Sequence, residues 1–185
     1  MSEVVRGFTR TLTGRIVLRV DIVEKGLLAT LLEQLIEFVS PESADSDADP
    51  LAAIVGIAED AQRPEDPALA RLFPDAYPDD PEASADFRRY TERGLREAKA
   101  AAATTALNSL EASGEKITLT VDQAQAWLGA LADIRLALGS RLEITEDNHE
   151  ELANLPDEDP RSGMFHLYDW LTYLTETLVR CLMPR

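Results

Sequence analysis

The stretch Thr120–Leu142, TVDQAQAWLGALADIRLALGSRL, predicts the central helix of the fold. Its large apolar side chains recur at the spacing that places them on one face of an α-helix: Trp127, Leu131, Ile134, Leu138 and Leu142. Thr120 and Gln123 have the spacing of a capping box, and Asp122 is the alternative N-cap. Burying five such side chains contributes up to about 10 kcal/mol before the entropy of ordering is subtracted. We therefore expect this helix to lie in the hydrophobic core.

The charged side chains of the same helix lead to a second prediction. Arg135 adjoins the apolar face, with Asp133 and Arg141 close to it in the sequence. A charge is rarely buried without a partner, because its desolvation is costly. We therefore expect at least one of these three residues to form a buried ion pair.

Short β-branched and apolar runs predict a small sheet beside the helices. Val4–Thr11 and Arg15–Val20 flank Thr13-Gly14, which indicates a β-hairpin. Lys116–Leu119, KITL, predicts a third short strand beside the hairpin. Because a lone hairpin is only marginally stable in water, helices must cover one of its faces. The predicted fold class is α+β, predominantly α, with an N-terminal β-hairpin and this third strand packed against a helical bundle.

Two further helices are predicted before the central one. Asp21 and Glu24 have capping-box spacing, and the helix that they start ends before Pro41. Ser84 is the expected N-cap of a long helix from about Ala85 to Ala112.

The last predicted helix spans Met164–Leu182 and opens at Ser162-Gly163. It is apolar on nearly all sides, which is typical of a helix that is central or lies at an interface. We therefore predict a homodimer formed through this helix.

Two parts of the chain are acidic and contain several prolines. Residues 41–86 hold 13 Asp and Glu residues against two arginines, Arg63 and Arg71. We predict a short helix at Leu51–Ala58, followed by a turn-rich segment whose apolar side chains fix it to the core: Leu69, Leu72, Phe73 and Tyr77. Asp147–Arg161 is predicted to be an acidic loop. A chain of 185 residues is most simply one domain, which we assign to 1–185 with this turn-rich acidic segment at about 41–86.

The formal net charge of −16 restricts the partners of the chain. An acidic body is repelled by phosphate, so we expect neither direct nucleic-acid binding nor association with membranes, and basic protein surfaces are favoured. The simpler interpretation is that the acidity only keeps the protein soluble. The first ten residues, MSEVVRGFTR, lack the apolar region of a signal peptide, so a cytoplasmic location is predicted.

No motif of a known catalytic or cofactor site occurs in the sequence. GxGxxG, GxxxxGK[ST], GxSxG and HExxH are all absent. We predict no cofactor, no metal and no catalytic residue. The weak exception is the pair His166 and Asp169, whose i, i+3 spacing on a helix is compatible with a metal ligand pair or an oriented imidazole. A small metal-dependent hydrolase built on this pair is the enzymatic alternative.

Three arginines, Arg89, Arg93 and Arg96, form a basic stripe on the long predicted helix. In one interpretation they pair with the acidic segment inside the fold. In the other they bind a partner or an anion. Engagement of the three guanidinium groups by carboxylates would count against the second interpretation.

Cys181 is the single cysteine of the chain. It lies on the apolar last helix, so it is either a buried small hydrophobic residue or a redox thiol that forms an intermolecular disulfide or is oxidised. Arg180 and Arg185 would favour the thiolate by lowering its pKa.

Three segments, together with the opening VVRGFTR, resemble the actinobacterial AosR-like family, which is otherwise defined as a domain of unknown function. They are DPALARLFPDAYPDDPEASADFRRYTE (Asp66–Glu92), AWLGALADIRLALGSRLEI (Ala126–Ile144) and LYDWLTYLTETLV (Leu167–Val179). The resemblance covers nearly the whole chain, and no catalytic role is attached to these segments.

The resemblance implies a non-enzymatic regulatory protein. Members of the family are expected to bind an extracytoplasmic-function sigma factor or RNA polymerase as transcriptional co-regulators, in oxidative-stress response and in control of cysteine biosynthesis. They are expected to sense oxidation through an intramolecular disulfide. This chain departs from that pattern, because Cys181 has no second cysteine to pair with. An adaptor in Clp-type proteolysis is a further alternative that the family's gene neighbourhood implies.

Overall fold

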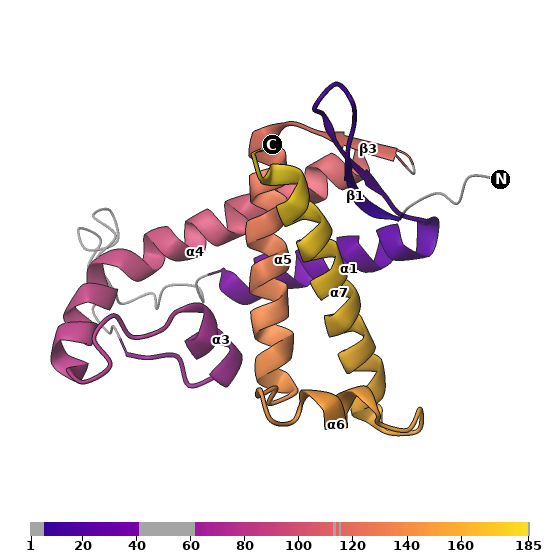
Figure 1. The fold of residues 1–185 in the computed structure, drawn as a ribbon. Coiled ribbons are helices and arrows are strands. Elements are labelled where there is room, and N and C mark those ends of the chain that lie inside the picture. Colours follow the sequence, from indigo (N-terminus) through magenta and orange to yellow (C-terminus); the bar gives the residue numbers. More distant parts are fainter. Residues whose placement is uncertain (1–5, 41–61, 113, 115, 185) are drawn as a thin grey trace.

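The computed structural model describes residues 6–40, 62–112, 114 and 116–184 (Figure 1). The elements follow one another as β1 (Gly7–Arg10), β2 (Ile16–Arg19), α1 (Ile22–Val39), α3 (Pro67–Leu72), α4 (Pro81–Glu111), β3 (Lys116–Leu119), α5 (Val121–Arg141), α6 (His149–Ala153) and α7 (Pro160–Leu182). The chain is thus mainly helical with one small sheet, which confirms the predicted fold class.

The sheet consists of three antiparallel strands in the order β1–β2–β3. Phe8 pairs with Leu18, and Leu18 pairs with Ile117. These three side chains share one face of the sheet and are buried in the main core. The predicted hairpin and third strand are therefore confirmed. At the hairpin turn Gly14 has a φ of 83°, a left-handed conformation that glycine adopts without a steric penalty.

Helix α7 lies close against the first strand. Gly7 has a φ of 94°, and a Cβ atom built there would lie 3.2 Å from the Tyr173 ring and 3.3 Å from the Thr177 hydroxyl. The Thr177 hydroxyl also accepts a hydrogen bond from the Phe8 amide at 3.2 Å. A side chain at position 7 would therefore push α7 away from the sheet.

Helix α5 occupies the centre, where it contacts α1, α3, α4 and α7 (Figure 1). Its first turn is closed by the predicted capping box, in which the Thr120 side chain accepts from the Gln123 amide and the Gln123 side chain accepts from the Thr120 amide. Trp127 and Leu131 are fully buried. The predicted apolar face divides at its end, because Leu142 belongs to a second small cluster and not to the main core.

Two predicted helix starts are wrong by a few residues. Helix α4 begins at Pro81 with Asp80 as its N-cap, so Ser84 lies inside the helix. Helix α7 begins at Pro160 with Asp159 as its N-cap. In both cases an aspartate accepts from the free amides of the first turn, and the following proline has no amide that needs a partner. The Ser84 hydroxyl instead bonds to the backbone of Tyr77.

The predicted acidic loop at residues 147–161 contains the short helix α6. Leu152 of this helix packs with Leu142 and Phe165 in the second cluster. This cluster closes the end of the molecule where α5, α6 and α7 meet (Figure 1). The acidic composition of the segment concealed this single buried leucine.

The described part of the acidic segment starts at residue 62, so the helix predicted at Leu51–Ala58 lies outside the described residues. Residues 62–80 contain α3 and a series of turns. Leu72 and Phe73 are buried as predicted, whereas Tyr77 is 50% exposed and packs edge-on against Phe87. The assignment of residues 1–185 to one domain stays a prediction.

Among the described helices, none is both long enough and apolar enough to span a membrane.

Candidate partner-binding groove and its charged surroundings

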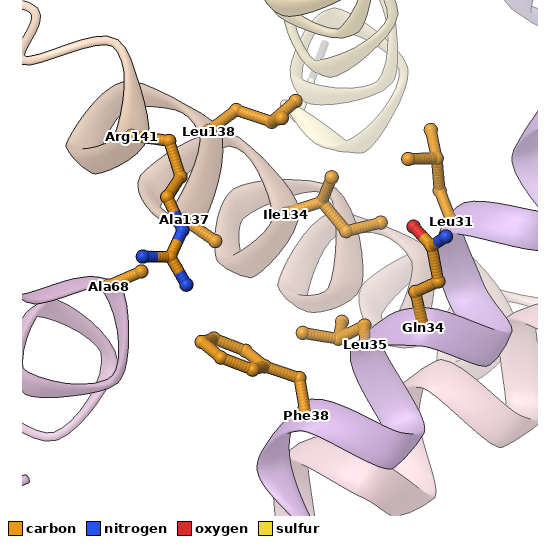
Figure 2. Close-up of a pocket in the computed structure, with 9 residues that line it drawn as sticks. All are labelled: Leu31, Gln34, Leu35, Phe38, Ala68, Ile134, Ala137, Leu138 and Arg141. Atoms are coloured by element: carbon orange, nitrogen blue, oxygen red, sulfur yellow. The ribbon is translucent and has the colours of Figure 1, made fainter. Parts of the chain in front are cut away.

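Helices α1, α3 and α5 line an open apolar groove with a volume of about 230 Å³ (Figure 2). Its walls are mainly aliphatic and aromatic, with one amide and one guanidinium group: Leu31, Gln34, Leu35, Phe38, Ala68, Ile134, Ala137, Leu138 and Arg141. We call this set the α1–α3–α5 groove. Ala68 and Ala137 contribute only methyl groups to its walls. Sequence periodicity did not reveal it, since a groove depends on the distances between helices.

An ion pair between α5 and α3 borders the groove. Arg141 Nη2 lies 2.6 Å from Asp66 Oδ2. Asp66 is also the N-cap of α3 and accepts from the amides of Ala68 and Leu69. Partial burial acts to raise the pKa of Asp66, but the hydrogen bonds from Arg141 and from the two amides outweigh it and lower the pKa. The one guanidinium in the groove is therefore already neutralised by a carboxylate.

Asp66→Asn is expected to lower the free energy of unfolding by roughly 0.5–1 kcal/mol at neutral pH, because asparagine still caps α3 but cannot pair with Arg141. The folded pKa of Asp66 is lowered, so its stabilisation is present above the unfolded pKa near 4 and is lost as the pH falls through the folded pKa. Urea unfolding of the wild type and of Asp66→Asn should show a difference in the free energy of unfolding that shrinks as the pH falls below 4. The exposed neighbour Glu65→Gln is the control. A difference that is constant with pH would contradict the ion-pair assignment.

The predicted arginine stripe lies on α4, and each of its members is engaged by a carboxylate. Arg89 lies 3.7 Å from Asp86, and Arg93 lies 3.0 Å from Glu97. Arg96 lies 2.8 Å from Glu92, and it also donates to the Val39 carbonyl and stacks on a phenylalanine ring. The stripe is therefore not a row of unpaired cations. This engagement counts against the interpretation in which the stripe binds a partner, a role that stays a prediction and for which Arg89 and Arg93 are the more exposed members.

Arg88, which the sequence did not single out, is the buried member of this basic region. It is only 6% exposed. Its guanidinium donates to the Phe73 carbonyl, to Asp75 at 2.8 Å and to Glu92 at 2.7 Å. Burial alone would lower the pKa of Arg88, but the hydrogen bonds to Glu92 and Asp75 raise it. The only signal in the sequence is the i, i+4 spacing from Glu92, and many exposed pairs share it.

Asp133 of α5 forms an ion pair that is partly buried, where a buried pair was expected. Lys99 Nζ of α4 lies 2.6 Å from Oδ1 of Asp133, which is 6% exposed. Arg135 is held differently, because its Nε donates to the Thr172 hydroxyl and its guanidinium lies over the Tyr168 ring. These contacts join α5 to α4 on one side and to α7 on the other.

His166 and Asp169 both lie on α7, and both are exposed. Among the described residues, no three His, Cys, Asp or Glu side chains are grouped closely enough to hold a metal ion. The i, i+3 pair therefore has no third ligand near it in the part of the chain that the structure describes.

Cys181 is buried on α7, where it belongs to the main core. Burial raises the pKa of its thiol, and the charge of Arg10 offsets this only in part. The expected net lowering of the pKa is therefore wrong in direction, and Arg185, one of the two arginines invoked for it, lies outside the described residues. Arg180 is exposed and points to Glu176. Whether Cys181 acts as a redox thiol stays a prediction.

N-ethylmaleimide is expected to label Cys181 at least about tenfold more slowly in the folded protein than in urea, because the thiolate is the reactive form and the thiol is buried with a raised pKa. Mass spectrometry of quenched samples measures the rate. A matched control is the double variant Cys181→Ser with Val179→Cys, since position 179 is 40% exposed on the same helix. Equal labelling rates in the folded and unfolded chain would show that the thiol is accessible.

These features define a mainly helical α+β protein with an open apolar groove and with many of its described arginine and lysine side chains paired with carboxylates. The chain belongs to the family described as a domain of unknown function, DUF2017, whose model matches residues 5–182. The predicted resemblance to AosR-like proteins is confirmed. No solved structure matches the chain.

Mycobacterial proteins are among its relatives. The oxidative stress regulators AosR of Mycobacterium bovis and of Mycobacterium tuberculosis are 38% identical to it over 174 residues, which cover 86% of this chain and 78% of each relative. A Mycobacterium leprae relative is 39% identical over 86% of this chain and 79% of its own length.

Proposed function

We propose that this chain is a non-enzymatic regulator of the oxidative-stress response that acts by binding another protein. The observation that carries the proposal is the 38% identity, over 86% of the chain, with proteins named as oxidative stress regulators. At this level of identity over almost the full chain, the fold and the main surfaces are expected to be shared. We further propose that the partner is an extracytoplasmic-function sigma factor, alone or bound to RNA polymerase, and that the regulated genes include those of cysteine biosynthesis.

The charges and the groove support protein binding over catalysis. The chain carries a net charge of −16, which favours a basic protein surface and opposes direct contact with nucleic acid. The groove between α1, α3 and α5 is apolar, and the single guanidinium in it is already bonded to Asp66. His166 and Asp169, the pair on which the hydrolase alternative rests, lie on an exposed surface and not in this groove.

Any redox response of this chain differs from an intramolecular disulfide. The 185 residues contain one cysteine, and its thiol is buried. Because Cys181 is only 6% exposed and burial raises its pKa, its thiol is poorly reactive toward oxidants in the folded chain. We therefore propose that the chain supplies the binding function, and that the signal that controls it does not depend on a cysteine pair.

Affinity purification of the tagged chain tests this proposal in the organism that encodes it. The chain should recover an extracytoplasmic-function sigma factor or RNA polymerase, with and without oxidant, and Cys181→Ser should recover the same protein. Recovery of a Clp protease subunit in its place would favour the adaptor alternative. Recovery of neither class would count against a regulatory function in transcription.

A further inference from the structure

The apolar surface of the α1–α3–α5 groove continues along α1. Val23 is 75% exposed and Leu27 is 40% exposed. Together with the groove residues Leu31, Gln34 and Phe38 they occupy positions i, i+4, i+8, i+11 and i+15, which lie on one face of the helix. The groove is thus one end of an apolar strip that runs for roughly 22 Å along α1. A strip of this length and shape suits a helix laid against it.

The volume of the groove suits a single large side chain. A cavity of roughly 150 Å³ accommodates a benzene molecule, and pockets for drug-sized ligands usually start near 300 Å³. At about 230 Å³ the groove has room for one leucine, phenylalanine or similar side chain. Figure 2 shows the Phe38 ring and the Ala137 methyl on two sides of this space, with the Arg141 guanidinium beside Ala137.

The exposed charges that α1 places beside the groove are acidic. Arg141 is bonded to Asp66 at 2.6 Å, so this cation is neutralised within the chain. Glu33 and Glu37 of α1 are exposed, and each directly precedes a groove residue, Gln34 or Phe38. Lysine or arginine side chains are therefore the complementary groups on the other side of the contact.

We propose that the α1–α3–α5 groove and the exposed strip of α1 bind an amphipathic helix of a basic protein. One bulky apolar side chain of that helix fills the cavity between Phe38 and Ala137. Its basic side chains, one helical turn away, meet the exposed carboxylates Glu33 and Glu37. The inference rests on the proposed function and deepens it, because it names the binding site on this chain and the kind of helix that the partner would present to it.

Charge distinguishes this occupant from two others. A second copy of the chain would bring another body of charge −16, with its own acidic residues facing those beside the groove. A small anionic amphiphile would meet the same exposed carboxylates of α1, and the guanidinium in the groove is already bonded to Asp66. A basic helix meets neither obstacle.

The test is calorimetric titration of a purified extracytoplasmic-function sigma factor into the full chain and two variants. Ala137→Phe places a ring in the groove, and the expected result is at least a tenfold weaker affinity because the partner's anchor is excluded. Ala101→Phe is the matched control, since Ala101 is exposed on α4 and does not line the groove. It should bind like the wild type. Circular dichroism melts establish that all three proteins are folded.

Glu37→Lys provides a second route, because an exposed charge reversal leaves the core intact. It should weaken binding several-fold and reduce the salt dependence of the affinity. Equal affinities of wild type, Ala137→Phe and Glu37→Lys would overturn the groove as the docking site while leaving the proposed function standing. Failure of the wild type to bind would remove both. Light scattering of the chain alone tests the other occupant. A wild-type dimer that Ala137→Phe converts to a monomer would show that a second copy binds the groove, and this result would overturn the inference.

Discussion

Arg88→Met is expected to lower the free energy of unfolding by about 3–5 kcal/mol, because it removes one partner from a buried network of charges. The Arg88 side chain is 6% exposed and bonds to the Phe73 carbonyl, Asp75 and Glu92. Without the guanidinium, the Phe73 carbonyl loses its side-chain donor in a place where water reaches it poorly, while among the described residues Glu92 keeps only Arg96 and Asp75 keeps only Arg63 at 3.6 Å. The turn that follows α3 should also loosen, since Arg88 is one of the side chains that join it to α4.

Equilibrium unfolding in urea, followed by circular dichroism, measures this effect. Arg93→Met is the matched control, because Arg93 is on the same helix but its side chain is 50% exposed. The control should cost less than about 1 kcal/mol, as exposed pairs usually do. Equal losses of stability in the two variants would contradict the account, because they would show that the Arg88 network stabilises the fold no more than an exposed ion pair does.

Trp127→Ala is expected to cost a similar amount, about 3–5 kcal/mol, because it opens a large cavity at the centre of the core. The Trp127 side chain is fully buried and meets the Phe8 ring edge-on at 5.8 Å between centroids. Its indole N–H donates to the Ser109 hydroxyl at 2.8 Å. The substitution therefore removes contacts between α5 and both β1 and α4.

Trp127→Phe separates volume from hydrogen bonding. It fills most of the space but leaves the Ser109 hydroxyl without its donor, so we expect a smaller loss of roughly 1–2 kcal/mol. Trp170→Ala is a second comparison, because Trp170 is only partly buried. Circular dichroism is the suitable signal, since the variants change tryptophan fluorescence. A Trp127→Ala protein as stable as Trp170→Ala would show that α5 is not the centre of the core.

The sequence predicts well those parts of the fold that depend on neighbours in the chain. The capping boxes at Asp21 and Thr120 are both formed. The strand at Lys116–Leu119 pairs with β2 as expected. In each case the sequence pattern that predicts the element lies within a few consecutive residues.

The errors arise where two local signals compete. Ser84 and Asp80 are both good N-caps, and Asp80 prevails because Pro81 after it is preorganised for the first turn of a helix. The same combination, Asp159 before Pro160, starts α7. Aspartate followed by proline is thus the stronger helix start in this chain, and it was readable in the sequence.

The candidate site could not be predicted, because it depends on packing between distant segments. Ala68 and Ala137 are far apart in the chain, and nothing in the sequence indicates that they face a common groove. Leu27 and Leu28 look alike in a helical pattern, yet one is 40% exposed and the other is fully buried. Arg88 and Arg89 are adjacent, and only the first is buried. Which face of a helix meets a neighbour is decided by the tertiary structure.

Titration of the purified wild-type chain with an extracytoplasmic-function sigma factor from the same organism tests the proposed regulatory binding. The account predicts saturable binding with a Kd of roughly 1 µM or tighter, weakened by added salt because an acidic surface meets a basic one. Absence of saturable binding at a hundredfold higher concentration, with both proteins folded, would contradict it.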